Sequence, residues 1–151
     1  MRFKKTRDVL DHVKRIHEQV SARCEEVCGK SGDERIRILF NYIAERERNL
    51  ARAVSEFTGE TADPVLDTWF QYTTDDATLD ALLTSGFQPD MVPEDLMRTT
   101  MAISDRLLDM YRNMLEATDT DELREVFRNL LEHEHKEKEK LARNLQMFHD
   151  L

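Results

Sequence analysis

Leu39-Phe-Asn-Tyr-Ile-Ala-Glu-Arg-Glu47 and Val126-Phe-Arg-Asn-Leu-Leu-Glu-His-Glu134 align with each other without a gap. Both stretches contain a Phe, an apolar pair and Glu-x-Glu in the same order. In and around each stretch, apolar residues recur at spacings of three and four, the pattern of a helix that buries one face. At about 100° of rotation per residue, the side chains of Glu47 and Glu134 point to the same side of the helix as the apolar stripe, whereas Glu45 and Glu132 point away from it. The sequence therefore predicts two related helices, each with one inward carboxylate.

Helix breakers are scarce in this chain of 151 residues, which contains four Gly and three Pro. They leave residues 1–28, 33–58 and 94–151 uninterrupted, which predicts long helices. The polar run 118–122 supplies N-cap residues that divide the last stretch into two helices. We therefore predict an all-α fold with four long helices in a single domain, residues 1–151.

The links between the predicted helices differ in length. Short links near 29–33 and 118–121 predict two antiparallel hairpins. The connection from about 58 to 93 is long enough to run the length of a bundle, and residues 76–84 within it have the pattern of a short helix. This arrangement predicts a four-helix bundle in which a long crossover containing a short helix joins the two hairpins.

Charge and composition limit the partners that we expect. The formal net charge is −9, from 22 Lys and Arg against 31 Asp and Glu, which argues against nucleic acid as a partner. No apolar run approaches the ~20 residues of a membrane span, so we expect no membrane partner and a cytoplasmic location. Cys24 and Cys28 are too few for a disulfide framework; lying one helical turn apart, they are either small core residues or a soft-metal pair.

Residues 53–97 contain ten Asp and Glu and no Lys or Arg. The aromatic residues Trp69, Phe70, Tyr72 and Phe87 lie in the same segment. In one interpretation these aromatics hold the crossover against the bundle. In the other, the segment is an acidic, aromatic interaction surface for a basic protein partner.

Two inward carboxylates require counter-charges, shared protons or a metal, because burying an unpaired carboxylate costs several kcal/mol. Counting back from the first hairpin, His17 lies at about the level of Glu47. Together with Glu134 and Glu137, these residues would offer one imidazole and three carboxylates, a set suited to iron, manganese or zinc. The alternative contains no metal: Glu134 pairs with Lys138, Glu47 pairs with an arginine from a neighbour, and His17 is a satisfied histidine at the core boundary.

Two hairpins joined by a long crossover, with Phe40-x-x-Ile-Ala-x-x-Glu47 and Phe127-x-x-Leu-Leu-x-x-Glu134, resemble the ferritin-like superfamily, most nearly its rubrerythrin-type branch. The resemblance implies a carboxylate-rich di-iron site, with Glu-x-x-His on the second and fourth helices. It also implies oxidant or peroxide handling and a homodimer. Leu50 and Glu137 stand where the motif histidines would be.

Two functions follow from these features. The first is a ferritin-like protein whose bundle core binds metal and handles iron or oxidants. The second is a metal-free helical interaction protein that uses residues 53–97. No Gly-rich phosphate loop or nucleophile elbow is present in the sequence, so nothing in it indicates hydrolysis, and whether the chain is an enzyme stays open.

Overall fold

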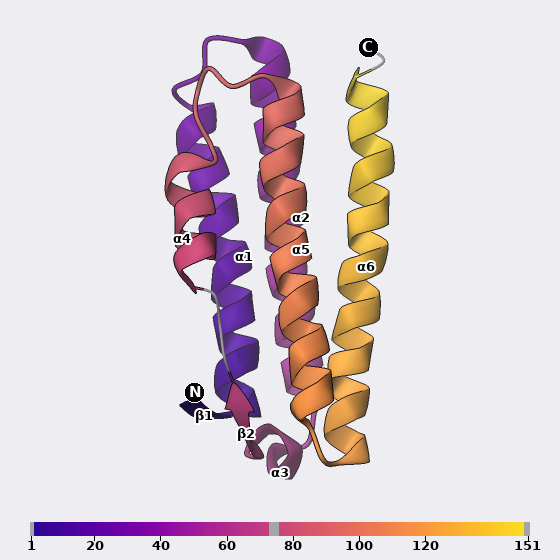
Figure 1. The fold of residues 1–151 in the computed structure, drawn as a ribbon. Helices are drawn as coiled ribbons and strands as arrows, with labels where there is room; N and C mark the ends of the chain where they lie inside the picture. Colours follow the sequence, from indigo (N-terminus) through magenta and orange to yellow (C-terminus); the bar gives the residue numbers. More distant parts are fainter. Residues whose placement is uncertain (1, 73–75, 150–151) are drawn as a thin grey trace.

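The computed structural model describes residues 2–72 and 76–149 and is dominated by helices. Four long helices run side by side (Figure 1): α1 (Thr6–Cys28), α2 (Glu34–Glu60), α5 (Pro93–Ala117) and α6 (Asp121–His149). The all-α class predicted from the scarcity of breakers is confirmed. Among the described residues, no helix has the length and apolar character of a membrane span.

The starts of α2, α5 and α6 lie where the sequence predicts them, whereas α2 continues through Gly59 to Glu60. The Asp33 carboxylate accepts a hydrogen bond from the Arg35 amide at 3.0 Å at the start of α2. Pro93 occupies the first turn of α5, where a missing amide proton costs little. The Thr120 hydroxyl accepts from the Leu123 amide at 3.3 Å and begins α6, separating it from α5.

Figure 1 shows how the chain connects the long helices. Helices α1 and α2 form one antiparallel hairpin, and α5 and α6 form another. The segment between α2 and α5 travels from one end of the molecule to the other, so α5 begins at the end where α2 also begins. As a result, α2 and α5 run in the same direction.

The crossover contains more structure than the single helix predicted for it. It consists of α3 (Asp63–Leu66), β2 (Trp69–Tyr72) and α4 (Asp76–Ser85). Strand β2 pairs antiparallel with β1 (Arg2–Lys5), with Lys5 opposite Trp69 and Arg2 opposite Tyr72. Neither strand was predicted, because each is four residues long and its partner lies more than 60 residues away in the sequence.

The core is a continuous apolar interior that the long helices share with the crossover. Phe40, Tyr111 and Phe127 are among its largest fully buried side chains. Phe87 and Leu79 are also buried and attach the crossover to the helices. Trp69 is 59% exposed, so the predicted clamping role belongs to Phe87 and not to Trp69. Asp75 lies outside the described residues, as do the side chains of Phe70 and Tyr72.

Candidate functional site

Four charged or titratable side chains meet in the middle of the core, and we call them the core cluster. They are His17 from α1, Arg46 and Glu47 from α2, and Glu134 from α6. The exposed fraction is 1% for His17 and Glu47, 2% for Glu134 and 7% for Arg46. Charged groups are this deeply buried only when they are paired, so their contacts decide what the cluster can do.

The His17 ring lies between the two carboxylates. Its Nδ1 atom is 2.5 Å from Glu47 Oε2, a short hydrogen bond. Its Nε2 atom is 3.5 Å from Glu134 Oε2, an ion-pair distance rather than a well-formed hydrogen bond. Arg46 Nη1 donates to the other oxygen of Glu47 at 2.8 Å. Glu47 is thus engaged through both oxygens, and the imidazole links it to Glu134.

The surroundings of His17 favour its protonated form. Burial lowers its pKa, but the charges of Glu47 and Glu134 and the contacts with both carboxylates outweigh burial and raise the pKa to about 10. For the Glu134 carboxyl, burial acts in the opposite direction and raises the pKa. The charges of His17, Arg46 and His133, together with the contact with His17, outweigh burial and bring the pKa of Glu134 below its usual value. Near neutral pH these shifts favour the cationic form of His17 and the anionic form of Glu134.

The structure brings together three of the four predicted metal ligands. His17 and Glu47 lie at the same level, as predicted, but His17 is fully buried and does not lie at the core boundary. Glu134 is buried and faces the ring. Among the described residues, the contacts of the cluster do not include Glu137, which is partly exposed. Glu45 and Glu132 are exposed, as the phase of the stripe predicts.

Lys138 pairs with Asp105 on α5 and not with Glu134. This corrects the predicted ion pair between residues one turn apart: Lys138 is partly exposed, and the carboxylate of Asp105 lies at the surface within its reach. The arginine that contacts Glu47 is Arg46, the preceding residue on the same helix, which the sequence analysis did not identify. A signal was present, because Arg46 stands three residues after Ile43 and four before Leu50, both buried.

A metal site of the kind implied by the resemblance requires several ligand atoms that converge on one point. Across residues 2–72 and 76–149, no group of three or more His, Cys, Asp or Glu side chains offers this arrangement. Glu47 contacts His17 through Nδ1, whereas Glu134 faces Nε2 on the other side of the same ring. An ion bound to either ring nitrogen of His17 would therefore have only one of these two carboxylates beside it. Arg46 adds a permanent positive charge. The residues of the core cluster therefore do not fit such a metal site.

The two cysteines are buried, and both are free thiols. Burial, together with the negative charge of Glu47, raises the pKa of the Cys24 thiol well above its usual value. A thiol held in this neutral form is a poor metal ligand and a poor nucleophile. This environment favours the interpretation of Cys24 as a small core residue.

The N-terminal segment neutralises one end of the acidic crossover. Arg7 Nη2 is 3.2 Å from Asp63 Oδ1 and 3.4 Å from Asp67 Oδ1. Lys5 Nζ is 5.4 Å from the centroid of the exposed Trp69 ring, a distance typical of a cation–π contact. Basic side chains of the chain itself therefore contact this part of the acidic crossover.

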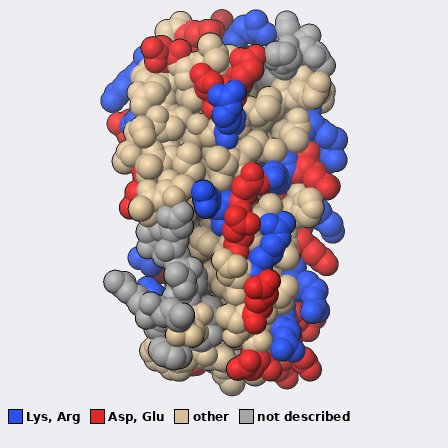
Figure 2. Space-filling model, viewed as in Figure 1, with Lys and Arg blue, Asp and Glu red and all other residues tan. Residues whose placement is uncertain are grey.

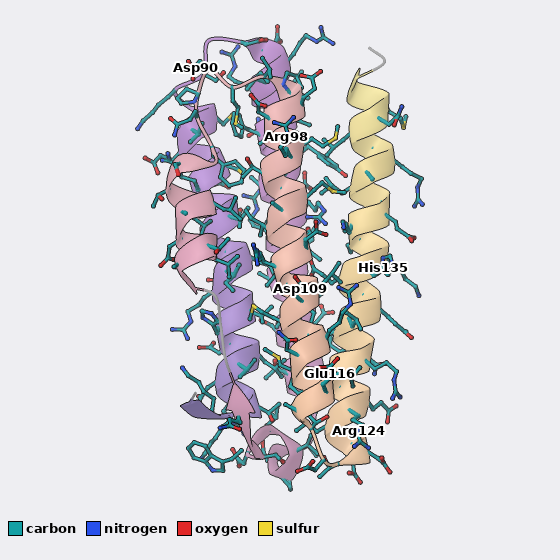
Figure 3. All side chains as sticks on the ribbon, in the orientation of Figure 1. Asp90, Arg98, Asp109, Glu116, Arg124 and His135 are labelled. Atoms are coloured by element: carbon teal, nitrogen blue, oxygen red, sulfur yellow. The ribbon has the colours of Figure 1, made fainter. Side chains whose placement is uncertain are left out.

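The remaining charges are unevenly distributed over the surface. In Figure 2 the face over α4 is almost free of charged side chains, whereas acids and bases are interspersed along α5 and α6. Figure 3 shows Asp90 in the loop before α5, at the opposite end of the molecule from Asp63 and Asp67. His135, which Figure 3 also labels on α6, is exposed, and its Nδ1 atom lies 3.8 Å from Glu139 Oε1. Asp63 and Asp67 thus lie at one end of the molecule and Asp90 at the other.

Comparison of the chain with protein-family models, with curated proteins and with solved structures found no match.

Proposed function

We propose that this chain is a metal-free helical protein on a ferritin-like four-helix bundle and that it acts by binding another protein. The path of the chain supports the ferritin-like assignment, because a full-length crossover makes α2 and α5 parallel (Figure 1). That path agrees with the sequence resemblance, in which two hairpins are joined in the same way.

The observation that carries the metal-free part of the proposal is the set of contacts in the core cluster. Arg46 and His17 both contact Glu47, and His17 also faces Glu134. The inward carboxylates are thus balanced by side chains of the chain itself. A cluster of this kind holds α1, α2 and α6 in register without requiring an ion from solution.

The surface of the crossover supports the binding part of the proposal. Among the described residues the large exposed apolar side chains are Ile38, Trp69, Val92 and Met147, and two of these belong to residues 53–97. In the sequence Trp69 stands two residues after Asp67, and Val92 stands two residues after Asp90, at the opposite end of the molecule. A basic protein with an apolar contact surface would match this combination. A second copy of the chain, as in a homodimer, is the other partner that the resemblance implies.

Elemental analysis of protein purified without chelator tests the metal-free part. We expect far less than one equivalent of iron, manganese or zinc, and a melting temperature that none of the three ions changes. One bound ion per chain, lost in Glu134→Gln, would contradict the proposal.

Trp69 fluorescence tests the binding part, since it is the only tryptophan. A lysine- and leucine-rich peptide should shift the Trp69 emission, and the effect should weaken steeply with salt. Size-exclusion chromatography with light scattering measures self-association in the same samples. An emission that no basic probe changes, in a protein that stays monomeric, would remove the support for an interaction role.

A second candidate function is binding of iron, manganese or zinc in the core, as the resemblance implies. The observation in its favour is that His17 Nε2 and Glu134 Oε1 are buried without a hydrogen-bond partner among the described residues. The elemental analysis decides between the two candidates.

A further inference from the structure

The start of the chain covers part of the crossover surface. Strand β1 pairs with β2 (Figure 1), and its last residue, Lys5, places Nζ 5.4 Å from the centroid of the exposed Trp69 ring. Arg7, in the first turn of α1, contacts the carboxylates of Asp63 and Asp67. We call β1 together with the Arg7 side chain the basic arm. It lies against the acidic, aromatic surface that we assign to a basic partner.

The basic arm is anchored at one point and held weakly beside it. Thr6 is fully buried, and its amide and hydroxyl groups both donate to the Thr68 carbonyl, at 3.0 and 3.1 Å. By contrast, the Arg7 side chain is 43% exposed and that of Asp63 is 84% exposed, and Nη2 lies 3.2 Å from Oδ1. Exposed ion pairs and exposed cation–π contacts stabilise a structure only slightly, because water competes for both groups. A competing ligand can therefore replace these contacts while Thr6 stays in place.

We propose that the basic arm is an internal competitor, which an extended basic segment of another protein displaces from Trp69, Asp63 and Asp67. Lys5 and Arg7 show the chemistry that this surface recognises: one cation over an indole face and a second cation between two carboxylates. Once β1 has left, the edge of β2 that it covered is open, which favours a partner in the extended conformation. This inference rests on the binding function proposed above and adds that the arm regulates it.

The test weakens the arm in the full chain by Lys5→Gln and Arg7→Gln together, which remove both cations and leave Thr6 in place. The probe is a peptide with the sequence of residues 2–7, and titration with it is followed by the emission of Trp69. The double variant should bind the peptide about threefold to tenfold more tightly than wild type, because the weakened arm occupies the surface for a smaller fraction of the time. Added salt should weaken binding in both proteins.

Lys30→Gln with Arg98→Gln is the matched control. It changes the net charge by the same amount, and its two cations pair with Glu26 and Asp95 at the surface, at the end of the molecule opposite β1. The control should bind the peptide as wild type does. Equal binding by all three proteins, or an equal gain in the control, would overturn the inference and leave the binding proposal intact. Binding by none of them would overturn both.

Proton NMR of wild type measures displacement of the arm without any variant. The Lys5 side-chain protons should lie upfield of their ordinary positions, because the Trp69 ring shields groups above its face, and the peptide should return them to those positions. Ordinary positions without peptide, or positions that the peptide leaves unchanged while it shifts the Trp69 emission, would overturn the inference. Light scattering is recorded on the same samples. Self-association of the double variant without peptide would also overturn it, because a second copy would then cover the surface.

Discussion

Raising the pH should destabilise this protein through His17. In the folded chain the pKa of His17 is about 10, against an ordinary value of 6.5 in the unfolded chain. Because the folded pKa is the higher one, the stabilisation is fully present below pH 6.5 and is lost as the pH rises toward 10. Each pH unit in that window removes about 1.4 kcal/mol, so the free energy of unfolding should fall by about 3 kcal/mol between pH 7 and pH 9.

Urea unfolding at pH 7 and pH 9 measures this loss. His17→Gln keeps a polar side chain of similar reach but cannot titrate, so its unfolding free energy should depend less on pH by about the same 3 kcal/mol. Nitrogen NMR of the wild-type ring provides a second measurement that does not depend on the variant folding. It should show both ring nitrogens protonated at pH 8. A His17 that titrates near pH 6.5, or equal pH dependence in wild type and variant, would refute the reasoning.

Three further predictions concern stability. Glu134→Gln leaves the cationic His17 without one of its partners and should lower the free energy of unfolding by about 3–5 kcal/mol, whereas the exposed Glu132→Gln should change it by less than about 0.5 kcal/mol in the same urea titration. Phe87→Ala should lower the free energy of unfolding by about 3–5 kcal/mol and make the crossover more sensitive to limited proteolysis, because Phe87 is fully buried. Trp69→Ala should leave the free energy of unfolding and the proteolysis rate nearly unchanged, because Trp69 is exposed. Gly86→Ala should lower the melting temperature, because its new Cβ would lie 2.3 Å from the backbone oxygen of the residue four positions earlier; an unchanged value would show that the backbone shifts without cost there.

The sequence alone determined the helical part of this protein. Helices α1, α2, α5 and α6 follow from apolar stripes, caps and breakers, all of which act over a few neighbouring residues. The same periodicity predicted that Glu47 and Glu134 point inward, since the direction of a side chain on a helix depends only on its position along the helix. Periodicity does not determine whether the two cysteines or the inward carboxylates bind a metal ion, because metal binding depends on how side chains from different helices converge.

Only the tertiary structure decided what the inward carboxylates contact. His17 lies between Glu47 and Glu134 only because α1, α2 and α6 pack with particular orientations about their axes. Arg46 contacts Glu47 inside the core only because its side chain adopts a particular conformation. The pairing of β1 with β2 and the bonds from Arg7 to Asp63 and Asp67 likewise join segments about 60 residues apart. Such contacts depend on how helices pack against one another, because packing and long-range pairing are properties of the whole chain and not of any local stretch.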